Sequence, residues 1–340
     1  MDVEPFSVEL ADPLGTARGT IQQRNGFLVT VGYNGRHGVG EATPLPGWTE
    51  SYEECREALN RGANIATELD WGVALAKLDT PAARHGLSLA FAEARARASD
   101  EPLYRSLGRD DLVESVPVNA TLSGDGTPSA VAHRAREAVK TGFQTLKLKV
   151  GTNGIEEDIE RVRAIRDAVG DEIAIRVDAN GAWTPVEARQ AIDSLAVLDV
   201  EYVEQPLSTA DLSAHAELRG SVDIALDESL VSHDIEDVIE SDAADVVIIK
   251  PMVLGGPDRA VAAALRAQEA GIDPVISNTI DAVVARTGAV HVAARIPDVR
   301  PCGLATGALL ETDLASDPAP IIDGEISVPQ DAGIGLPERL

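Results

Sequence analysis

Lysine is scarce in this chain of 340 residues, where it occurs only at positions 77, 140, 147, 149 and 250. The other basic residues are arginine, and 56 acidic against 29 basic residues give a formal net charge of −27 at pH 7. Such a surface repels nucleic acid and anionic lipid, so we expect neither as a partner. An excess of acid this large also suggests a halophilic protein, because high salt makes self-repulsion tolerable.

Cysteine and long apolar runs are also lacking. Cys55 and Cys302 are the only cysteines and form no CxxC pair, which excludes a disulfide framework and a structural zinc site. No apolar run approaches the length of a membrane span, and the start MDVEPFSVEL is too acidic for a secretory signal. We therefore expect a soluble, cytoplasmic protein; no sequence pattern specifies its oligomeric state.

A repeated pattern of short β-branched run, turn and alanine-rich helical segment begins near residue 116. Eight strands in series without a second set predict an α/β fold of the (β/α)₈ type, a TIM-like barrel. A doubly wound open sheet is the competing fold, but NATLSGDGTPS after the first strand lacks the GxGxxG spacing. The expected strands are 116–122, 145–150, 173–180, 200–206, 223–229, 245–251, 273–279 and 299–306, and the expected helices are 128–141, 155–169, 185–198, 257–270 and 282–295.

The first 105 residues follow a different pattern. Alternating stretches such as FLVTVGY predict antiparallel strands, and helices are expected at 52–69 and 81–98. This indicates an α+β capping domain at 1–105 before a barrel at 106–318. The tail, 319–340, is too short to fold alone, and we expect it to pack back on the cap.

Three acids end consecutive strands of the expected barrel: Asp178, Glu204 and Asp227. In such barrels the C-terminal strand ends form the site, and three carboxylates meeting there need a cation to offset their repulsion. Oxygen ligands without His or Cys favour Mg²⁺, with Mn²⁺ as an alternative. Each acid alone is better explained as a helix N-cap or a surface carboxylate, but three at matching positions favour the metal site.

Lysines 147 and 149 are two apart on one strand and so share a face, while Leu146 and Leu148 share the other. If the leucines meet the helices, the lysines point into the barrel, where burial and the neighbouring ammonium would lower the pKa of a lysine base. Lys250 ends the apolar run VVIIK in a comparable position. A solvated basic face for the pair, or a structural ion pair for Lys250, is the alternative.

The ordered motifs KLK, VDAN, VEQP, DES and IIKP, following an α+β cap, resemble the enolase superfamily over nearly the whole chain. The likeness is to the muconate-lactonizing branch, which has a KxK strand and a lysine on the sixth strand. VISNT, without a histidine at the end of the seventh strand, speaks against the mandelate-racemase branch. The resemblance implies that Asp178, Glu204 and Asp227 bind one Mg²⁺ that stabilises an enediolate, with Lys149 and Lys250 as acid/base groups and Lys147 tuning Lys149.

Within that branch, GEATPLPGWTES (40–51), RVDANGAWTP, VISNT and CGLAT resemble the o-succinylbenzoate synthase family of menaquinone biosynthesis. The resemblance implies Mg²⁺-dependent syn-dehydration of a small carboxylate, 2-succinyl-6-hydroxy-2,4-cyclohexadiene-1-carboxylate, to 2-succinylbenzoate. It also implies that Arg176, Ser277 and Gly303 lie near the substrate's carboxylate or succinyl group.

Three other functions stay open. A dipeptide epimerase or N-acylamino-acid racemase would use the same metal and both lysines as bases, and a muconate cycloisomerase is a further relative. A non-catalytic barrel would be expected to have a broken set of metal and lysine residues, whereas here the set is complete.

Overall fold

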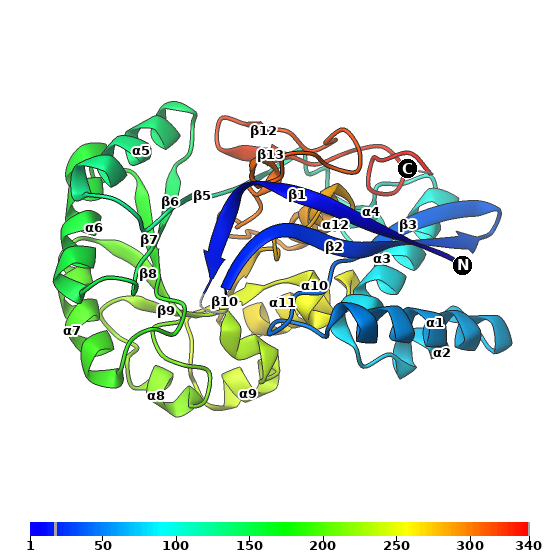
Figure 1. Ribbon diagram of the computed structural model, residues 1–340, viewed down its shortest axis with the longest axis horizontal. Coiled ribbons are helices and arrows are strands. Elements are labelled where there is room, and N and C mark those ends of the chain that lie inside the picture. The colour runs from blue at the N-terminus through cyan, green and yellow to red at the C-terminus, as the bar shows by residue number, and fades with distance from the viewer. Residues whose placement is uncertain (17–18, 339–340) are drawn as a thin grey trace.

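The computed structural model describes residues 1–338 except 17 and 18, and it consists of a cap and a curled parallel sheet surrounded by helices (Figure 1). The cap is an antiparallel sheet of order β1-β2-β3 packed on helices. Its core combines strand residues such as Val29 and Val31 with Leu59 of α1 and Leu87 of α3. The cap elements are β1 (Asp2–Thr16), β2 (Gly19–Tyr33), β3 (Arg36–Ala42), α1 (Tyr52–Glu68), α2 (Trp71–Lys77) and α3 (Pro81–Ala98).

The larger unit is a seven-stranded parallel sheet of order β11-β10-β9-β8-β7-β6-β5. Its strands are β5 (Ala120–Leu122), β6 (Thr145–Lys149), β7 (Ala174–Asp178), β8 (Val200–Glu204), β9 (Asp223–Leu226), β10 (Val246–Ile249) and β11 (Asp273–Ile276). Its helices are α5 (Pro128–Lys140), α6 (Ile155–Val169), α7 (Pro185–Ala196), α8 (Leu212–Ala216), α9 (Ile235–Glu240), α10 (Pro251–Leu254), α11 (Pro257–Glu269) and α12 (Val283–Arg295). The α/β barrel predicted from the sequence is thus confirmed.

The eighth strand expected at 299–306 is reduced to two isolated parallel bridges, Ser277 with Gly303 and Cys302 with Val118. Pro301 has no backbone N–H and Gly303 is a poor strand former, which accounts for the short pairing. The bridges still connect β11 to the residues just before β5, and so the two edges of the sheet meet. A short 3₁₀ helix, η2 (Gly307–Leu309), follows.

The first expected strand, 116–122, is also divided, into β4 (Ser115–Pro117) and β5. The chain changes partners between them, because the Val118 N–H donates to the Gly324 carbonyl and the Asn119 N–H to that of Cys302. β4 instead pairs with the C-terminal hairpin, in a small sheet of order β12-β13-β4. The remaining elements are α4 (Leu103–Ser106), β12 (Ile321–Ile322) and β13 (Glu325–Ser327).

The C-terminal segment contacts both units. Its hairpin adds to β4, whereas Ile334 and Leu336 pack with Val39, Leu89 and Leu103. The domain boundaries at 105 and 318 stay a prediction. No helix in the described part of the chain has the length and apolar character needed to cross a membrane.

Side chains alternate across β6 as its sequence predicts. Leu146 and Leu148 are fully buried in the layer between the sheet and helices α5 to α7, together with Val131 and Ile159. The lysines of the same strand therefore face the interior of the curled sheet.

Candidate active site

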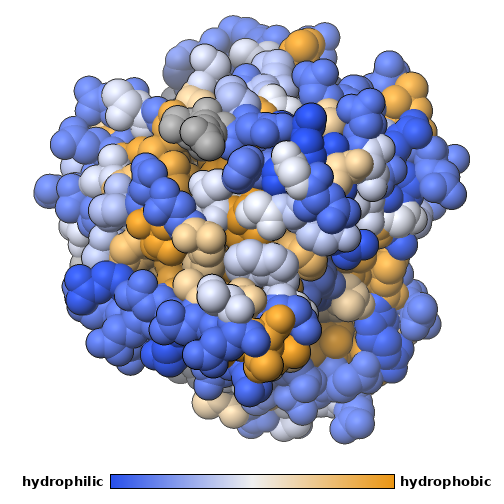
Figure 2. Space-filling view, turned by 90° about the vertical axis from the view of Figure 1, so that its right-hand side faces the viewer, coloured by the Kyte–Doolittle hydropathy of each residue, from blue (hydrophilic) through white to orange (hydrophobic). Residues whose placement is uncertain are grey.

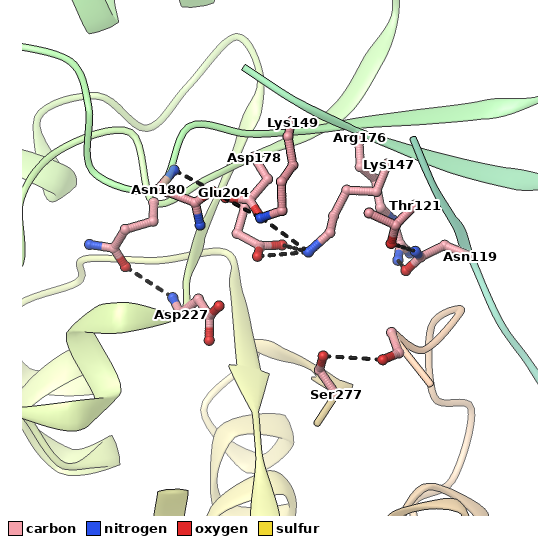
Figure 3. A network of polar contacts seen from close by, with 12 residues as sticks. Asn119, Thr121, Lys147, Lys149, Arg176, Asp178, Asn180, Glu204, Asp227 and Ser277 are labelled. Atoms are coloured by element: carbon pink, nitrogen blue, oxygen red, sulfur yellow. Dashed lines mark hydrogen bonds and ion pairs between the residues drawn. The ribbon is translucent and has the colours of Figure 1, made fainter. Parts of the chain in front are cut away.

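The candidate site lies where β6 to β10 end. These strands are parallel neighbours, and Lys149, Asp178 and Glu204 are aligned in register on β6, β7 and β8. Figure 3 shows Lys147 and Lys149 of β6 pointing toward Asp178 of β7 and Glu204 of β8. The strand ends thus bring together the residues that the sequence analysis selected from distant positions.

Lys147 holds the carboxylate of Glu204. Its Nζ lies 2.9 and 3.1 Å from the two oxygens of Glu204 and 3.4 Å from Asp178 Oδ2 (Figure 3). Burial raises the pKa of Glu204 to about 7; Asp178 raises it further, whereas Lys147 opposes the rise. For Lys147 itself, burial favours the neutral amine, but the charges of Glu204 and Asp178 outweigh it and raise the pKa.

Lys149 extends further toward solvent, with 42% of its side chain exposed. Its Nζ lies 2.9 Å from Asp178 Oδ2 and 2.9 Å from Asn180 Oδ1. Burial alone would lower the pKa of Lys149, but the Asp178 carboxylate outweighs it and raises the pKa. The expectation of a lowered pKa is therefore wrong for this arrangement, because Asp178 is paired with the lysine itself.

Lys250 ends β10 on the other side of the site. Its Nζ lies 2.6 Å from Asp227 Oδ2 and 3.6 Å from the centre of the Trp48 ring, which belongs to the cap. Burial raises the pKa of Asp227 to about 6, with Lys250 opposing and Glu228 adding to the rise. Lys250 is thus enclosed between a barrel carboxylate and a cap aromatic ring, and a small pocket beside it is lined by Trp48, Leu230 and Val253.

Asp178, Glu204 and Asp227 have the oxygen ligands that a hard divalent cation prefers, but their side chains are not arranged around one point. Among the residues that the structure describes, no three His, Cys, Asp or Glu side chains are grouped closely enough to hold a metal ion. Asp178, Glu204 and Asp227 each hold a lysine ammonium group instead. Oδ1 of Asp227 is nevertheless buried without a hydrogen-bond partner, which is a position that a cation would satisfy. The all-oxygen set suits Mg²⁺ or Mn²⁺ once the lysines turn aside.

Ser277, which follows β11, forms a parallel bridge with Gly303. In Figure 3, Ser277 lies apart from Lys147 and Lys149 of β6. Ser277 Oγ donates to the Gly303 carbonyl at 3.2 Å, and a Cβ at position 303 would lie 2.7 Å from that Oγ. A larger residue at position 303 would therefore require the Ser277 side chain to move.

Arg176 is buried within the barrel, with its donors already engaged. Its Nε donates to Glu201 at 2.7 Å and its Nη1 to the Pro301 carbonyl at 2.6 Å, and the guanidinium stacks on Tyr202. Its role as a substrate ligand stays a prediction, and these contacts favour a structural role.

Four polar or aromatic residues of the site were given no role from the sequence: Trp48, Asn180, Gln205 and Glu228. Asn180 donates to Glu228 Oε1 at 2.9 Å, and Gln205 Oε1 accepts from the backbone N–H groups of Asp227 and Ser229. Asn180 and Gln205 have positive φ angles of 46° and 41°. Asn180, Gln205 and Glu228 belong to the motifs VDAN, VEQP and DES, and this could have identified them as site residues from the sequence. Nothing in the sequence links Trp48 to Lys250.

Family models and known proteins match most of the chain. Residues 130–337 match the model of the enolase C-terminal domain-like family, and residues 6–94 match the MenC N-terminal domain. An o-succinylbenzoate synthase from Thermobifida fusca is 40% identical over 220 residues, which span 63% of this chain and 67% of the relative. A hydrophobic dipeptide epimerase from Enterococcus faecalis is 33% identical over 95% of this chain and 92% of its own. The crystal structure of the E. faecalis V583 dipeptide epimerase with Mg and L-Leu-L-Tyr superposes with a TM-score of 0.88, at 31% identity and 98% coverage of both chains.

Proposed function

The chain belongs to the enolase superfamily, and we propose that within it the protein is an o-succinylbenzoate synthase. The observation that carries this proposal is the match of residues 6–94 to the MenC N-terminal domain. That segment contains the loop 40–51, which brings Trp48 against Lys250. The 40% identical synthase from T. fusca supports the same choice. We assign the activity to menaquinone biosynthesis in the cytoplasm.

Asp178, Glu204 and Asp227 would hold one Mg²⁺ or Mn²⁺. When bound, this ion would withdraw electron density from the substrate's carboxylate and so acidify the neighbouring C–H bond. Engaging Asp178 there would free Lys149 from its ion pair, while the positive charge of Lys147 would still lower the pKa of Lys149. Lys149 would then be a base in the loaded site.

The two acid/base lysines stand on opposite sides of the barrel. Three strands separate β6 from β10 on one side, and β11, the bridge residues 302–303 and β5 separate them on the other. Lys149 would take the α-proton of 2-succinyl-6-hydroxy-2,4-cyclohexadiene-1-carboxylate and return it to the departing hydroxyl group on the same face, releasing water and 2-succinylbenzoate. Lys250, as a cation on the other face, would stabilise the negative charge that develops in between.

Ser277 and Gly303 would form the part of the site that receives the succinyl group. Residues 277–279 are Ser, Asn and Thr, and residues 302–306 are CGLAT, so neither segment carries an acid. Asp281, the nearest acid along the chain, already accepts from the N–H and Oγ1 of Thr279. A free ammonium group, as in a dipeptide, would find no carboxylate within these two segments, whereas a succinyl carboxylate would meet hydroxyl and amide donors. This favours the synthase over an epimerase of unblocked dipeptides.

Dipeptide epimerisation is the second candidate, and the E. faecalis enzyme supports it by covering nearly the whole chain. It requires the same ligands and both lysines as bases, so only a comparison of substrates separates the two reactions. The test is one preparation with Mg²⁺ given the cyclohexadiene substrate, a panel of dipeptides and N-succinyl amino acids. The synthase proposal predicts the highest kcat/KM for the diene; a higher value for any dipeptide would favour the epimerase.

A further inference from the structure

Helix α3 of the cap contacts both the backbone that follows Lys250 and the loop that carries Trp48. Lys250 leads directly into the four-residue helix α10, whose Val253 and Leu254 N–H groups donate to the Lys250 carbonyl at 3.0 and 3.1 Å. Gly255 and Gly256 then lead into α11 with φ angles of 88° and 143°. Pro251, Met252 and Val253 of this turn are buried, and Met252 packs in the core of the cap, so the position of the turn depends on what the cap places against it.

Arg84 of α3 binds this turn through three hydrogen bonds. Its Nη1 donates to the Gly255 carbonyl at 2.5 Å and to Asp258 Oδ1 at 3.0 Å, and its Nη2 donates to Asp258 Oδ2 at 2.8 Å. Ser88, one helical turn further along α3, donates to Asp258 Oδ1 at 2.7 Å. The arginine side chain is 7% exposed, whereas the side chain of Asp258 is 49% exposed, so the pair lies at the edge of the interface between α3 and α11 with its guanidinium buried. A Cβ at Gly256 would lie 2.6 Å from Ser88, which shows how closely the helix and the turn approach.

The first turn of the same helix holds the Trp48 loop. Thr80, the N-cap residue, makes no side-chain cap bond, and Glu50 takes its place by accepting from the N–H groups of Ala82 and Ala83 at 3.0 and 2.8 Å. Carboxylates are stabilised at helix N-termini in this way. Glu50 lies two residues from Trp48, whose loop is closed by hydrogen bonds from the N–H groups of Trp48 and Thr49 to the Leu45 carbonyl.

We propose that Arg84 and Glu50 are positioning residues that fix Lys250 and Trp48 against each other through α3. The cap thereby controls the half of the site that contains Lys250. Lys149, in contrast, is held by Asp178 and Asn180 of the barrel itself. The catalytic consequence rests on the role proposed above for Lys250, whereas the positional claim does not.

The fluorescence of Trp48 reports whether the Lys250 ammonium group lies against its ring, and this measurement needs no substrate. Trp71 and Trp183 are the only other tryptophans, so Trp71→Phe with Trp183→Phe gives a background in which Trp48 alone emits. An ammonium group beside the indole changes the energy of its excited state, and Lys250→Met in this background defines the emission without that charge. Arg84→Gln is expected to reproduce most of the change in Trp48 emission that Lys250→Met causes. Arg84→Lys retains one donor group and should therefore cause a smaller part of that change.

Two controls separate positioning from a general loss of stability. Arg166 is a buried arginine that donates to the carbonyls of Gly170, Ile173, Leu198 and Asp199, away from Lys250. Arg166→Gln should lower the melting temperature without changing Trp48 emission. Arg259→Gln changes an exposed arginine next to Asp258 and should alter neither the melting temperature nor the Trp48 emission.

With the diene substrate, Arg84→Gln should reduce kcat by about 10- to 100-fold with little change in KM, because a small displacement of a reacting group has an effect of that size. If Arg84→Gln does not fold, Asp258→Asn is the substitute, because it removes the negative charge of the Arg84–Asp258 pair at its exposed end. It should shift the Trp48 emission in the same direction as Lys250→Met. The proposal is overturned if a folded Arg84 or Asp258 variant keeps the emission of its parent. If the wild-type protein does not turn over the diene, the proposed function fails, yet the emission still decides the positional claim.

Discussion

The ammonium group of Lys147 lies between the two carboxylate oxygens of Glu204, at 2.9 and 3.1 Å, with only 13% of the lysine side chain exposed. The two residues come from β6 and β8, and Asp178 of the intervening strand lies 3.4 Å away. Lys147 thus provides a positive charge to two of the carboxylates that we propose as cation ligands. We therefore expect this buried ion pair to contribute to the stability of the fold, in addition to its place in the candidate active site.

Glu204→Gln is expected to destabilise the metal-free protein. Lys147 would keep only Asp178 as a counter-charge, and removing one partner of a buried pair typically costs ~3–5 kcal/mol, of which Asp178 should offset a part. Urea unfolding in the presence of a chelator measures the difference. Glu137→Gln, which breaks the exposed pair with Lys140, is the matched control and should have little effect. Equal stabilities for the Glu204 and Glu137 variants would show that Lys147 does not depend on Glu204.

Mg²⁺ or Mn²⁺ should raise the melting temperature of chelator-treated protein in a saturable way. A ligand at 100 times its dissociation constant contributes about 2.7 kcal/mol to the folded state. Asp178→Asn with Asp227→Asn removes two of the proposed ligands and should abolish the response. The same rise in this double variant would mean that the ion binds elsewhere.

The sequence could predict the barrel and the residues at its strand ends because both rest on local patterns. The alternation of leucine and lysine in TLKLK fixes which face of β6 meets the helices, and the structure confirms this for Leu146 and Leu148. The expected helices also lie within two residues of α5, α6, α7, α11 and α12 at each end. Prolines at the first positions of α5, α7 and α11, together with Thr127 and Thr184 as N-caps, supplied clear start signals.

What the sequence could not predict depends on contacts between distant segments. The partner change at Val118 and the short pairing at Cys302 follow from how the sheet closes, which no local pattern encodes. The raised pKa of Lys149 depends on Asp178, which lies 29 positions further along the chain and is its direct partner without the metal. Trp48 likewise meets Lys250 only because the cap folds against α10.

Glu41 should make stability depend on pH. It is fully buried at the end of β3, where it accepts from the N–H groups of Ala282 and Ala285 at the start of α12. Burial and Asp281 raise the pKa of Glu41 from 4.5 to about 7, against hydrogen bonds from Thr43 and the helix. The buried guanidinium of Arg24 is the opposite charge near this pair.

An acid whose pKa is raised by folding contributes stability below its unfolded value, and that contribution is lost as the pH rises through its folded value. Between pH 4.5 and 7 the wild-type protein should thus lose up to about 3 kcal/mol through Glu41. Glu41→Gln should lack this loss, so the difference in unfolding free energy between the two proteins should narrow as the pH rises. Glu53→Gln replaces an exposed acid of α1, and its unfolding free energy should change with pH in the same way as that of the wild-type protein. If the unfolding free energy of Glu41→Gln also changes with pH as the wild-type value does, Glu41 is not the source of the pH dependence.

The acidic composition predicts a salt response. The face of the molecule on the cap side is largely hydrophilic, with apolar residues in separate patches (Figure 2). At a net charge of −27, screening should reduce self-repulsion as KCl rises from low to molar concentration. For a chain of this length, each kcal/mol gained corresponds to about 1–2 °C in melting temperature. A melting curve that does not rise with KCl, or rises equally with a neutral osmolyte, would contradict the halophilic interpretation.

The conversion of 2-succinyl-6-hydroxy-2,4-cyclohexadiene-1-carboxylate, followed by the loss of its diene absorbance, tests the central claim most directly. With Mg²⁺ the wild-type protein should consume the diene and release 2-succinylbenzoate, and a chelator should stop it. Lys149→Ala should stay folded by circular dichroism and lose at least about 10²–10⁴-fold in kcat, while Lys140→Ala, at an exposed lysine of α5, should match wild type. Persistence of the diene absorbance with folded, Mg²⁺-loaded wild-type protein would contradict the synthase assignment, and full activity of Lys149→Ala would contradict the identity of the base.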